Sequence, residues 1–118
     1  MNLLNQKILN EYVFFLKKVK YKNIIQTLKL EYCLDEDGDY VYLVIIVVKK
    51  SKRKMGYGNS IMKDIIQLAN NYNVRIKLWV SDMYGTDYNV LFNFYKKHGF
   101  KLINDKNEKE MIFYPKKK

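Results

Sequence analysis

Apolar side chains recur at three- and four-residue intervals through the first twenty residues, which is the period of an amphipathic helix. The positions on this stripe are Leu4, Ile8, Tyr12, Phe15 and Val19. We predict a helix over about residues 2–20, within an N-terminal segment of residues 1–22, that covers one side of a sheet. Further apolar residues widen the stripe, so the chain is expected to be a monomer or a homodimer joined through this helix. These residues are Leu3, Val13, Phe14 and Leu16.

The next segment, residues 26–34, alternates polar and apolar side chains, as expected for a half-buried strand. An acidic stretch with an Asp-Gly step follows at residues 35–39 and predicts a hairpin turn. A calcium loop is the alternative for these carboxylates, but the twelve-residue ligand spacing and its final Glu are missing. Residues 40–48 are almost continuously apolar, which predicts a central strand covered on both faces.

A helical pattern over residues 59–72 and a strand pattern over residues 74–80 follow. A strand, a crossover helix and a second strand in this order predict a right-handed parallel unit. Ligands of such units bind at the carboxyl ends of the strands. We therefore expect a binding site just after residue 48 and just after residue 80.

The remainder of the chain predicts one more helix and one more hairpin. After a loop at residues 81–87, the helix is expected over residues 89–97, where Gly99 supplies a left-handed end. The hairpin is expected from strands at residues 100–103 and 109–114. Together the elements predict one α/β domain with a mixed, mostly antiparallel central sheet, one parallel strand pair and flanking helices.

The loop after the apolar strand, residues 49–58, combines five basic residues with Gly56 and Gly58. Amide groups at a helix N-terminus have no partner within the helix and attract anions. Glycine lets bulky phosphate oxygens approach the backbone and adopts turns with positive φ. This loop therefore predicts a phosphate site, and the alternative is an ordinary strand-to-helix loop with a solvated charge run.

Composition narrows the class of protein. The 118 residues carry a formal charge of +10, which favours anionic partners such as phosphorylated cofactors, nucleic acid or an acidic protein surface. The single cysteine, Cys33, and the single histidine, His98, offer no disulfide and no structural metal site, so we expect no metal. No apolar run is long enough for a membrane span. We expect a cytoplasmic protein without a membrane association.

Two motifs bear on the function of the chain. The first is Arg53-x-x-Gly56-x-Gly58, and the second is Leu91-Phe92-Asn93-Phe94-Tyr95-Lys96-Lys97-His98-Gly99-Phe100. They resemble the pyrophosphate loop (Arg/Gln-x-x-Gly-x-Gly/Ala) and the Ala-x-x-Phe-Tyr-x-x-x-Gly-Phe segment of the GNAT superfamily of acetyl-CoA-dependent N-acetyltransferases. The resemblance covers residues 40–114 and is to a short member with one domain over residues 1–118.

The resemblance implies how acetyl-CoA is held. In this family the two parallel strands splay apart at their carboxyl ends, and the pantetheine arm enters the wedge like an extra strand. Main-chain groups of the first strand would bind its amides, and loop amides and basic side chains would bind its phosphates. The implied cofactor residues are Ile46, Val47, Val48, Arg53, Lys54, Met55, Gly56, Tyr57, Gly58, Asn59, Asn89 and Tyr95.

The resemblance also assigns Tyr95 the role of the acid that protonates the departing CoA thiolate. Two positions depart from the family pattern: Tyr88 stands where an Asn is usual, with Asn89 one place later, and Leu91 replaces a small Ala. Cys33 lies on an early strand, so we expect direct transfer without a covalent intermediate.

The base that neutralises the acceptor amine is left among several candidates. Glu31, Asp39, Asp82 and a chain of waters are all considered, and Asp82 is favoured because it follows the second parallel strand at the wedge. His98 is interpreted as a helix-end residue.

Three functions are compatible with the sequence. The first is an N-acetyltransferase acting on a primary amine, on a protein lysine or N-terminus. The second is a catalytically silent basic module that binds nucleic acid or a nucleoprotein. The third combines both, with a basic face that docks the enzyme on a nucleoprotein whose amines it modifies.

Overall fold

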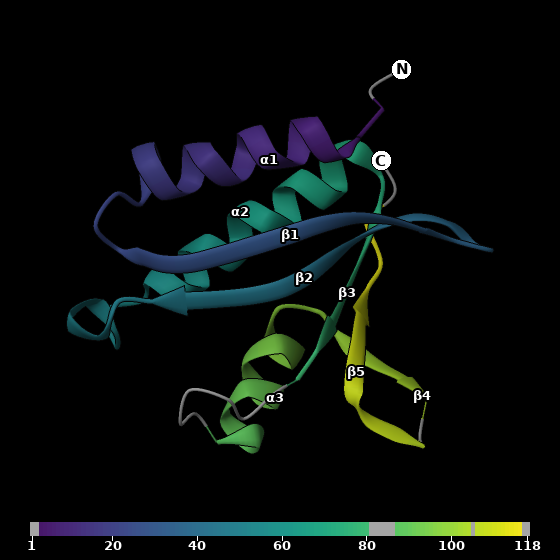
Figure 1. Cartoon of the computed structure of the whole chain (residues 1–118). Coiled ribbons are helices and arrows are strands. Elements are labelled where there is room, and N and C mark those ends of the chain that lie inside the picture. Colours follow the sequence, from purple (N-terminus) through teal and green to yellow (C-terminus); the bar gives the residue numbers. More distant parts are fainter. Residues whose placement is uncertain (1–2, 81–86, 105, 117–118) are drawn as a thin grey trace.

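A five-stranded sheet, in the order β1-β2-β3-β5-β4, organises the computed structural model, which describes residues 3–80, 87–104 and 106–116 (Figure 1). Only β2 and β3 are parallel, and the other neighbouring strands are antiparallel. The predicted mixed α/β fold is confirmed. The strands are β1 (Ile25–Asp35), β2 (Gly38–Val48), β3 (Arg75–Trp79), β4 (Lys101–Asn104) and β5 (Asn107–Phe113).

The predicted N-terminal helix is present as α1 (Gln6–Phe15), which continues into a wider π-helical turn, η1 (Leu16–Lys20). Asn5 begins α1, because its side-chain oxygen accepts from the N–H of Ile8 at 2.9 Å. The hydroxyl of Tyr12 donates to the main-chain oxygen of Asp64 at 2.8 Å, and the carboxylate of Asp64 pairs with Lys20 at 2.9 Å. These contacts fix α1 on α2 (Tyr57–Tyr72).

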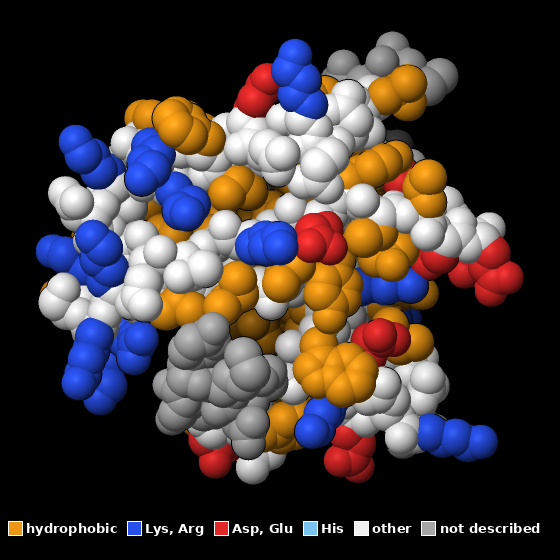
Figure 2. Space-filling view, in the orientation of Figure 1, with side chains coloured by type: hydrophobic (Ala, Val, Ile, Leu, Met, Phe, Trp, Pro, Cys, Tyr) orange, Lys and Arg blue, Asp and Glu red, His pale blue; other side chains and the backbone are white. Residues whose placement is uncertain are grey.

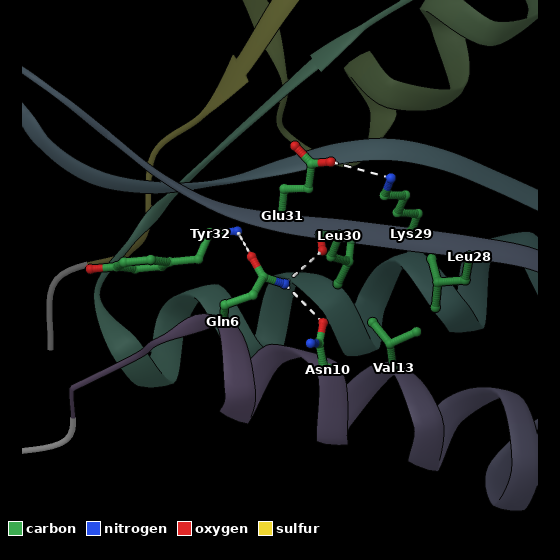
Figure 3. Close-up of a pocket in the computed structure, with 8 residues that line it drawn as sticks. All are labelled: Gln6, Asn10, Val13, Leu28, Lys29, Leu30, Glu31 and Tyr32. Atoms are coloured by element: carbon green, nitrogen blue, oxygen red, sulfur yellow. Dashed lines mark hydrogen bonds and ion pairs between the residues drawn. The ribbon is translucent and has the colours of Figure 1, made fainter.

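The free edge of β1 is covered by one side chain of α1 rather than by another strand. The amide oxygen of Gln6 accepts from the N–H of Tyr32 at 2.8 Å, and its nitrogen donates to the carbonyl of Leu30 at 3.3 Å (Figure 3). Gln6 thus satisfies the two main-chain groups that a neighbouring strand would use, which protects the edge from pairing with another chain.

The predicted hairpin between β1 and β2 is confirmed, and Gly38 occupies its turn with a φ of 114°. The calcium alternative fails because the carboxylate of Asp35 is already paired. It accepts from Arg75 at 2.7 and 3.1 Å and from Lys77 at 2.8 Å. These hydrogen bonds hold the pKa of Asp35 well below its usual range.

The prediction that β2 is covered on both faces is wrong. Val41 and Leu43 are buried against the helices, but Val44 is 41% exposed and Tyr42 is half-buried. The reason is that α1, α2 and α3 (Tyr88–Lys97) share one apolar core on the same side of the sheet. Among the described residues no helix covers the other side, which we call the helix-free face.

A residue with positive φ lies at the end of each of two helices, as predicted for Gly99. Asn73 ends α2 with a φ of 54°, and Gly99 follows α3 with a φ of 97°. The predicted C-terminal hairpin is present as β4 and β5. None of the helices in the described ranges combines the length and the hydropathy needed to cross a membrane.

Candidate active site

The parallel strands β2 and β3 separate halfway along β2. Their pairing runs from Tyr40 opposite Arg75 to Leu43 opposite Leu78, whereas β2 remains paired with β1 as far as Val48. Figure 1 shows β2 and β3 diverging beyond this point. Within the part of the chain that the structure describes, the edge of residues 44–48 that faces away from β1 has no strand beside it. The splay implied by the family resemblance is present.

A bulge at Val44 accompanies the separation. Leu30 lies opposite Leu43, but the preceding residue of β1, Lys29, lies opposite Ile45, so Val44 is an extra residue in β2. Such a bulge increases local twist and shifts the alternation of side chains by one place. The cross-strand pairs Leu30–Leu43 and Leu28–Ile46 lie on one face, because Leu28 and Leu30 are both buried there.

The shift brings Ile46 and Val48 to a cavity of about 190 Å³ between the end of β2, the first turn of α2 and α3. Its lining is apolar apart from main-chain groups and one hydroxyl. The lining residues are Ile46, Val48, Gly58, Val90, Leu91, Phe94 and Tyr95. An open strand edge next to an apolar cavity can accept an extended, amide-containing chain by strand addition.

The basic loop leads from β2 to the N-terminus of α2 through a short 3-10 turn, η2 (Lys50–Lys52). Gly56 precedes α2 with a φ of 84°, a conformation that favours glycine, and the first helical bond runs from Ser60 N–H to the Gly56 carbonyl at 3.2 Å. No side chain caps this end, and among the described residues the N–H groups of residues 57–59 have no acceptor. These amides are available to an anion.

Arg53 lies at the open edge of β2. The N–H of Lys49 donates to Ile24 beside β1, so the carbonyl of Val48, on the opposite side of that peptide, points to the open edge. The Nε of Arg53 donates to this carbonyl at 3.0 Å. The side chain of Arg53 is exposed and is not among the lining residues of the cavity.

Tyr95 is the polar side chain among the cavity residues. It is only 8% exposed, and burial raises the pKa of its phenol to about 12. Its ring packs edge-on against Phe100 with centroids 5.7 Å apart. Because its pKa is raised, the phenol is protonated at neutral pH. No hydrogen bond joins its hydroxyl to another described residue.

Asn59 and His98 join α2 to the end of α3. The Nε2 of His98 lies 3.0 Å from the Oδ1 of Asn59, and Phe94 lies over Gly58. Burial, helped by the charges of Lys97 and Lys63, lowers the pKa of His98, so the ring is neutral at pH 7. His98 follows the last residue of α3, in agreement with its interpretation as a helix-end residue.

Several residues implied by the resemblance lie outside the cavity. Asn89 is in the first turn of α3, where its N–H donates to Asp87 at 2.7 Å and its side chain is exposed. Lys54 and Met55 are exposed on the loop, and Val47 is not among the lining residues. Asp82 lies outside the described residues.

The helix-free face carries three residues near the splay that sequence reasoning missed. Trp79, 48% exposed, follows the last β2–β3 pair and lies opposite Glu110 of β5. Tyr42, the residue before Leu43 of the last β2–β3 pair, lies on the same face of the sheet as Trp79. Burial is the main cause that raises the pKa of Tyr42, and the negative charge of Glu110 is the next. The alternation within residues 109–114 was the signal that could have placed Glu110 on this face.

Two of the predicted base candidates already have partners, and one of them, Glu31, lies on the helix-free face beside Tyr42. Glu31 lies opposite Tyr42 and pairs with Lys29 at 3.4 Å, and the carboxylate of Asp39 accepts from the hydroxyl of Tyr32 at 3.0 Å. In the described ranges no three His, Cys, Asp or Glu residues gather in a way that could hold a metal ion.

The chain has the fold of the GNAT acetyltransferases. No protein-family model matches the sequence, and no curated protein matches it. Among solved structures, the anti-CRISPR protein AcrVA5 is similar at 18% identity with a TM-score of 0.58, over 73% of this chain and 88% of that chain.

Two further structures support the same fold. AtaTR bound with AcCoA is similar at 16% identity and a TM-score of 0.54, over 89% of this chain and 78% of that one. A putative GNAT-family acetyltransferase from Bacteroides thetaiotaomicron has 17% identity and a TM-score of 0.52, over 92% of this chain and 70% of that chain. At these identities the comparisons establish the fold, and the chemistry must be argued from the residues.

Proposed function

We propose that the protein transfers an acetyl group from acetyl-CoA to a primary amine. The observation that carries this proposal is the convergence of two features on one cavity. β2 loses its parallel neighbour after Leu43, and the uncapped N-terminus of α2 opens at the end of the exposed edge. AtaTR, one of the similar structures, is bound with AcCoA, which supports the choice of co-substrate.

The residues present fit acetyl-CoA. The amides of Tyr57, Gly58 and Asn59 would bind the diphosphate, with Arg53 and Lys54 adding positive charge. The open edge of residues 44–48 would pair with the amides of pantetheine, whose apolar parts would fill the cavity beside Ile46 and Val48. When bound, acetyl-CoA supplies the thioester that the amine attacks.

Tyr95 would act as the general acid. In direct transfer, the neutral amine nitrogen forms a bond to the thioester carbonyl carbon and loses a proton to a base, the carbon–sulfur bond breaks, and the departing thiolate takes a proton. The Tyr95 hydroxyl lines the cavity and is protonated, so it can give that proton. The only thiol of the chain, Cys33, lies opposite Tyr40 near the hairpin turn, away from the cavity.

The acceptor would approach from the helix-free face, because the cavity on the other face is filled by the CoA arm. A lysine amine of pKa near 10.4 is charged at pH 7, and removing its proton costs about 4.6 kcal/mol. Glu110 would attract the ammonium, and Trp79 and Tyr42 would contact its aliphatic stem. We therefore propose a cationic primary amine, on a protein lysine or N-terminus, with Glu110 joining Asp82 as a candidate base.

Calorimetric titration with acetyl-CoA tests the first step of the proposal. The native chain should bind saturably at neutral pH and low salt, and Gly56→Glu should not bind, because a side chain cannot adopt this φ without strain and the added charge repels phosphate. Lys106→Glu on the β4–β5 turn is the control for a change of charge. Absence of saturable binding by the native chain would remove acetyl transfer as its function.

Acetylation of a lysine-containing peptide tests the acceptor. Glu110→Gln should raise the KM for the peptide at least about tenfold and leave the affinity for acetyl-CoA unchanged, because a charge-assisted contact to the ammonium is lost. Glu108→Gln, two residues away on β5 and exposed, should behave like the native chain. Equal KM values for all three proteins would exclude Glu110 from acceptor binding.

A further inference from the structure

Positive charge collects at one end of the molecule, where two lysine-rich segments lie side by side. The first segment, residues 17–22, covers most of η1 and the start of the turn after it. The second segment, residues 49–54, follows β2. The N–H of Lys49 donates to the carbonyl of Ile24 at 2.8 Å, which fixes the start of the second segment beside the turn that follows the first. Figure 2 shows Lys and Arg side chains gathered at this end, on the left of the view.

We call these two segments together the basic end. They contain nine of the 22 Lys and Arg residues and no Asp or Glu, in a chain whose formal charge is +10. Among the described residues, the only ion pair at the basic end joins Lys20 to Asp64 at 2.9 Å. Most of the excess charge of the protein therefore lies here without an internal counter-charge.

We infer that the basic end binds the phosphate backbone of nucleic acid without regard to sequence. Eight of its nine cations are lysines, which act as mobile point charges, and only Arg53 has the planar fork that reads a base edge. Lysine contacts to phosphates supply affinity and little sequence information. This binding goes beyond acetyl transfer and does not depend on it.

The composition of the basic end argues against a lipid surface. Interfacial segments insert several apolar side chains below the headgroups. Within the two segments, Val19 is exposed, but the ring of Tyr21 is buried in the core, and residues 49–54 contain no apolar side chain. The exposed side chains of Phe14, Phe15 and Met55 flank the two segments, so lipid vesicles are tested beside the duplex.

The residues chosen for the test must not disturb the phosphate loop of the cavity. Residues 49–54 belong to that loop, whereas Lys17, Lys18 and Lys22 lie on the first segment, outside the cavity. Reversing these three charges therefore separates nucleic-acid binding from acetyl-CoA binding. The matched control reverses Lys101, Lys106 and Lys109, which are exposed on the β4–β5 hairpin at another end of the molecule (Figure 1).

The experiment is fluorescence anisotropy with a labelled 20-base-pair duplex of random sequence, measured from 50 to 200 mM salt. With about four phosphates neutralised, the native affinity should fall about 100-fold over this range. The triple variant Lys17→Glu, Lys18→Glu, Lys22→Glu should bind at least about 30-fold more weakly at 50 mM salt and show a shallower salt dependence. The hairpin triple variant should stay within about threefold of the native chain, and both variants should bind acetyl-CoA as the native chain does.

Three results would overturn the inference. The native chain could fail to bind the duplex at 50 mM salt, or both triple variants could lose the same affinity, which would make net charge the only determinant. The third result is that the native chain binds polyglutamate, or phosphatidylserine vesicles, as tightly as the duplex at the same charge concentration. This result would assign the basic end to an acidic protein or to a membrane.

Discussion

Leu43 and Leu78 form the last residue pair between the parallel strands β2 and β3, and the bulged residue Val44 comes directly after it. The two features act together. The pairing with β3 ends where the bulge re-aims β2, so Ile46 and Val48 turn toward the cavity and the strand edge beside them opens. The main-chain groups on that edge then lead to the free amides at the start of α2.

Replacing Tyr95 by Phe should separate catalysis from binding. The ring still fills the same space, so the affinity for acetyl-CoA should stay within about twofold, but the thiolate loses its proton donor. We expect kcat to fall about 100-fold, within the usual range for a general acid. Tyr72→Phe, on α2 away from the cavity, is the control, and an unchanged rate for Tyr95→Phe would exclude its acid role.

The pH profile should rise and then stay level. A general acid works in its protonated form, and burial raises the pKa of Tyr95 to about 12, so its activity is present at every pH below that value. The acceptor amine works in its neutral form, so kcat/KM should increase from pH 6 up to the pKa of the amine, about 10.4 for a lysine, and then stay level. A fall in kcat/KM between pH 9 and 10, in a protein shown to remain folded, would contradict the assignment.

The two loop glycines should respond differently to alanine. A Cβ at Gly58 would meet the Phe94 ring at 3.7 Å, an ordinary contact, so Gly58→Ala should keep its melting temperature and lose acetyl-CoA affinity through crowding of the phosphates. Gly56→Ala should lose both, because its φ of 84° is strained for alanine. Thermal melting and calorimetry on the same samples measure the two effects, and equal melting temperatures for both variants would contradict the strain argument.

The ion pairs of Asp35 should stabilise the fold above acidic pH only. Hydrogen bonds from Arg75 and Lys77 lower the folded-state pKa of Asp35, so its contribution is present above the unfolded value near 3.9 and is lost as the pH falls through the folded value. Asp35→Asn should therefore melt below the native chain at pH 7, and the difference should shrink as the pH falls below about 4. Asp37→Asn, in the same turn, should melt like the native chain at both pH values.

The pattern along the sequence was sufficient to predict the elements because each has a clear period and clear ends. The α1 stripe, the alternation of β1 and the Asp-Gly turn all depend on local geometry, which a single sequence carries. The exposure of Val44 could not be predicted in this way. A continuous apolar run indicates a strand covered on both faces, and here it instead reflects a bulge and the placement of all three helices on one side.

The sequence predicted those residues of the candidate site that belong to a motif. It did not predict those residues that only the tertiary structure brings together. Gly56, Gly58 and Tyr95 stand in recognisable spacings. Glu110 and Trp79 come from strands 31 residues apart and become neighbours only through the register of β3 against β5. Contacts of this kind have no local signal, so the sequence did not predict the proposed acceptor side.

Amide hydrogen exchange with and without acetyl-CoA tests whether the open edge of β2 and the start of α2 form one binding site. When acetyl-CoA is added, exchange should slow in two segments, residues 44–48 on the open edge of β2 and residues 55–60 at the start of α2. The β4–β5 hairpin should exchange equally in both samples. Protection confined to the hairpin, or none in either segment at saturating acetyl-CoA, would contradict the claim that the separated strands and the free amides form one binding site.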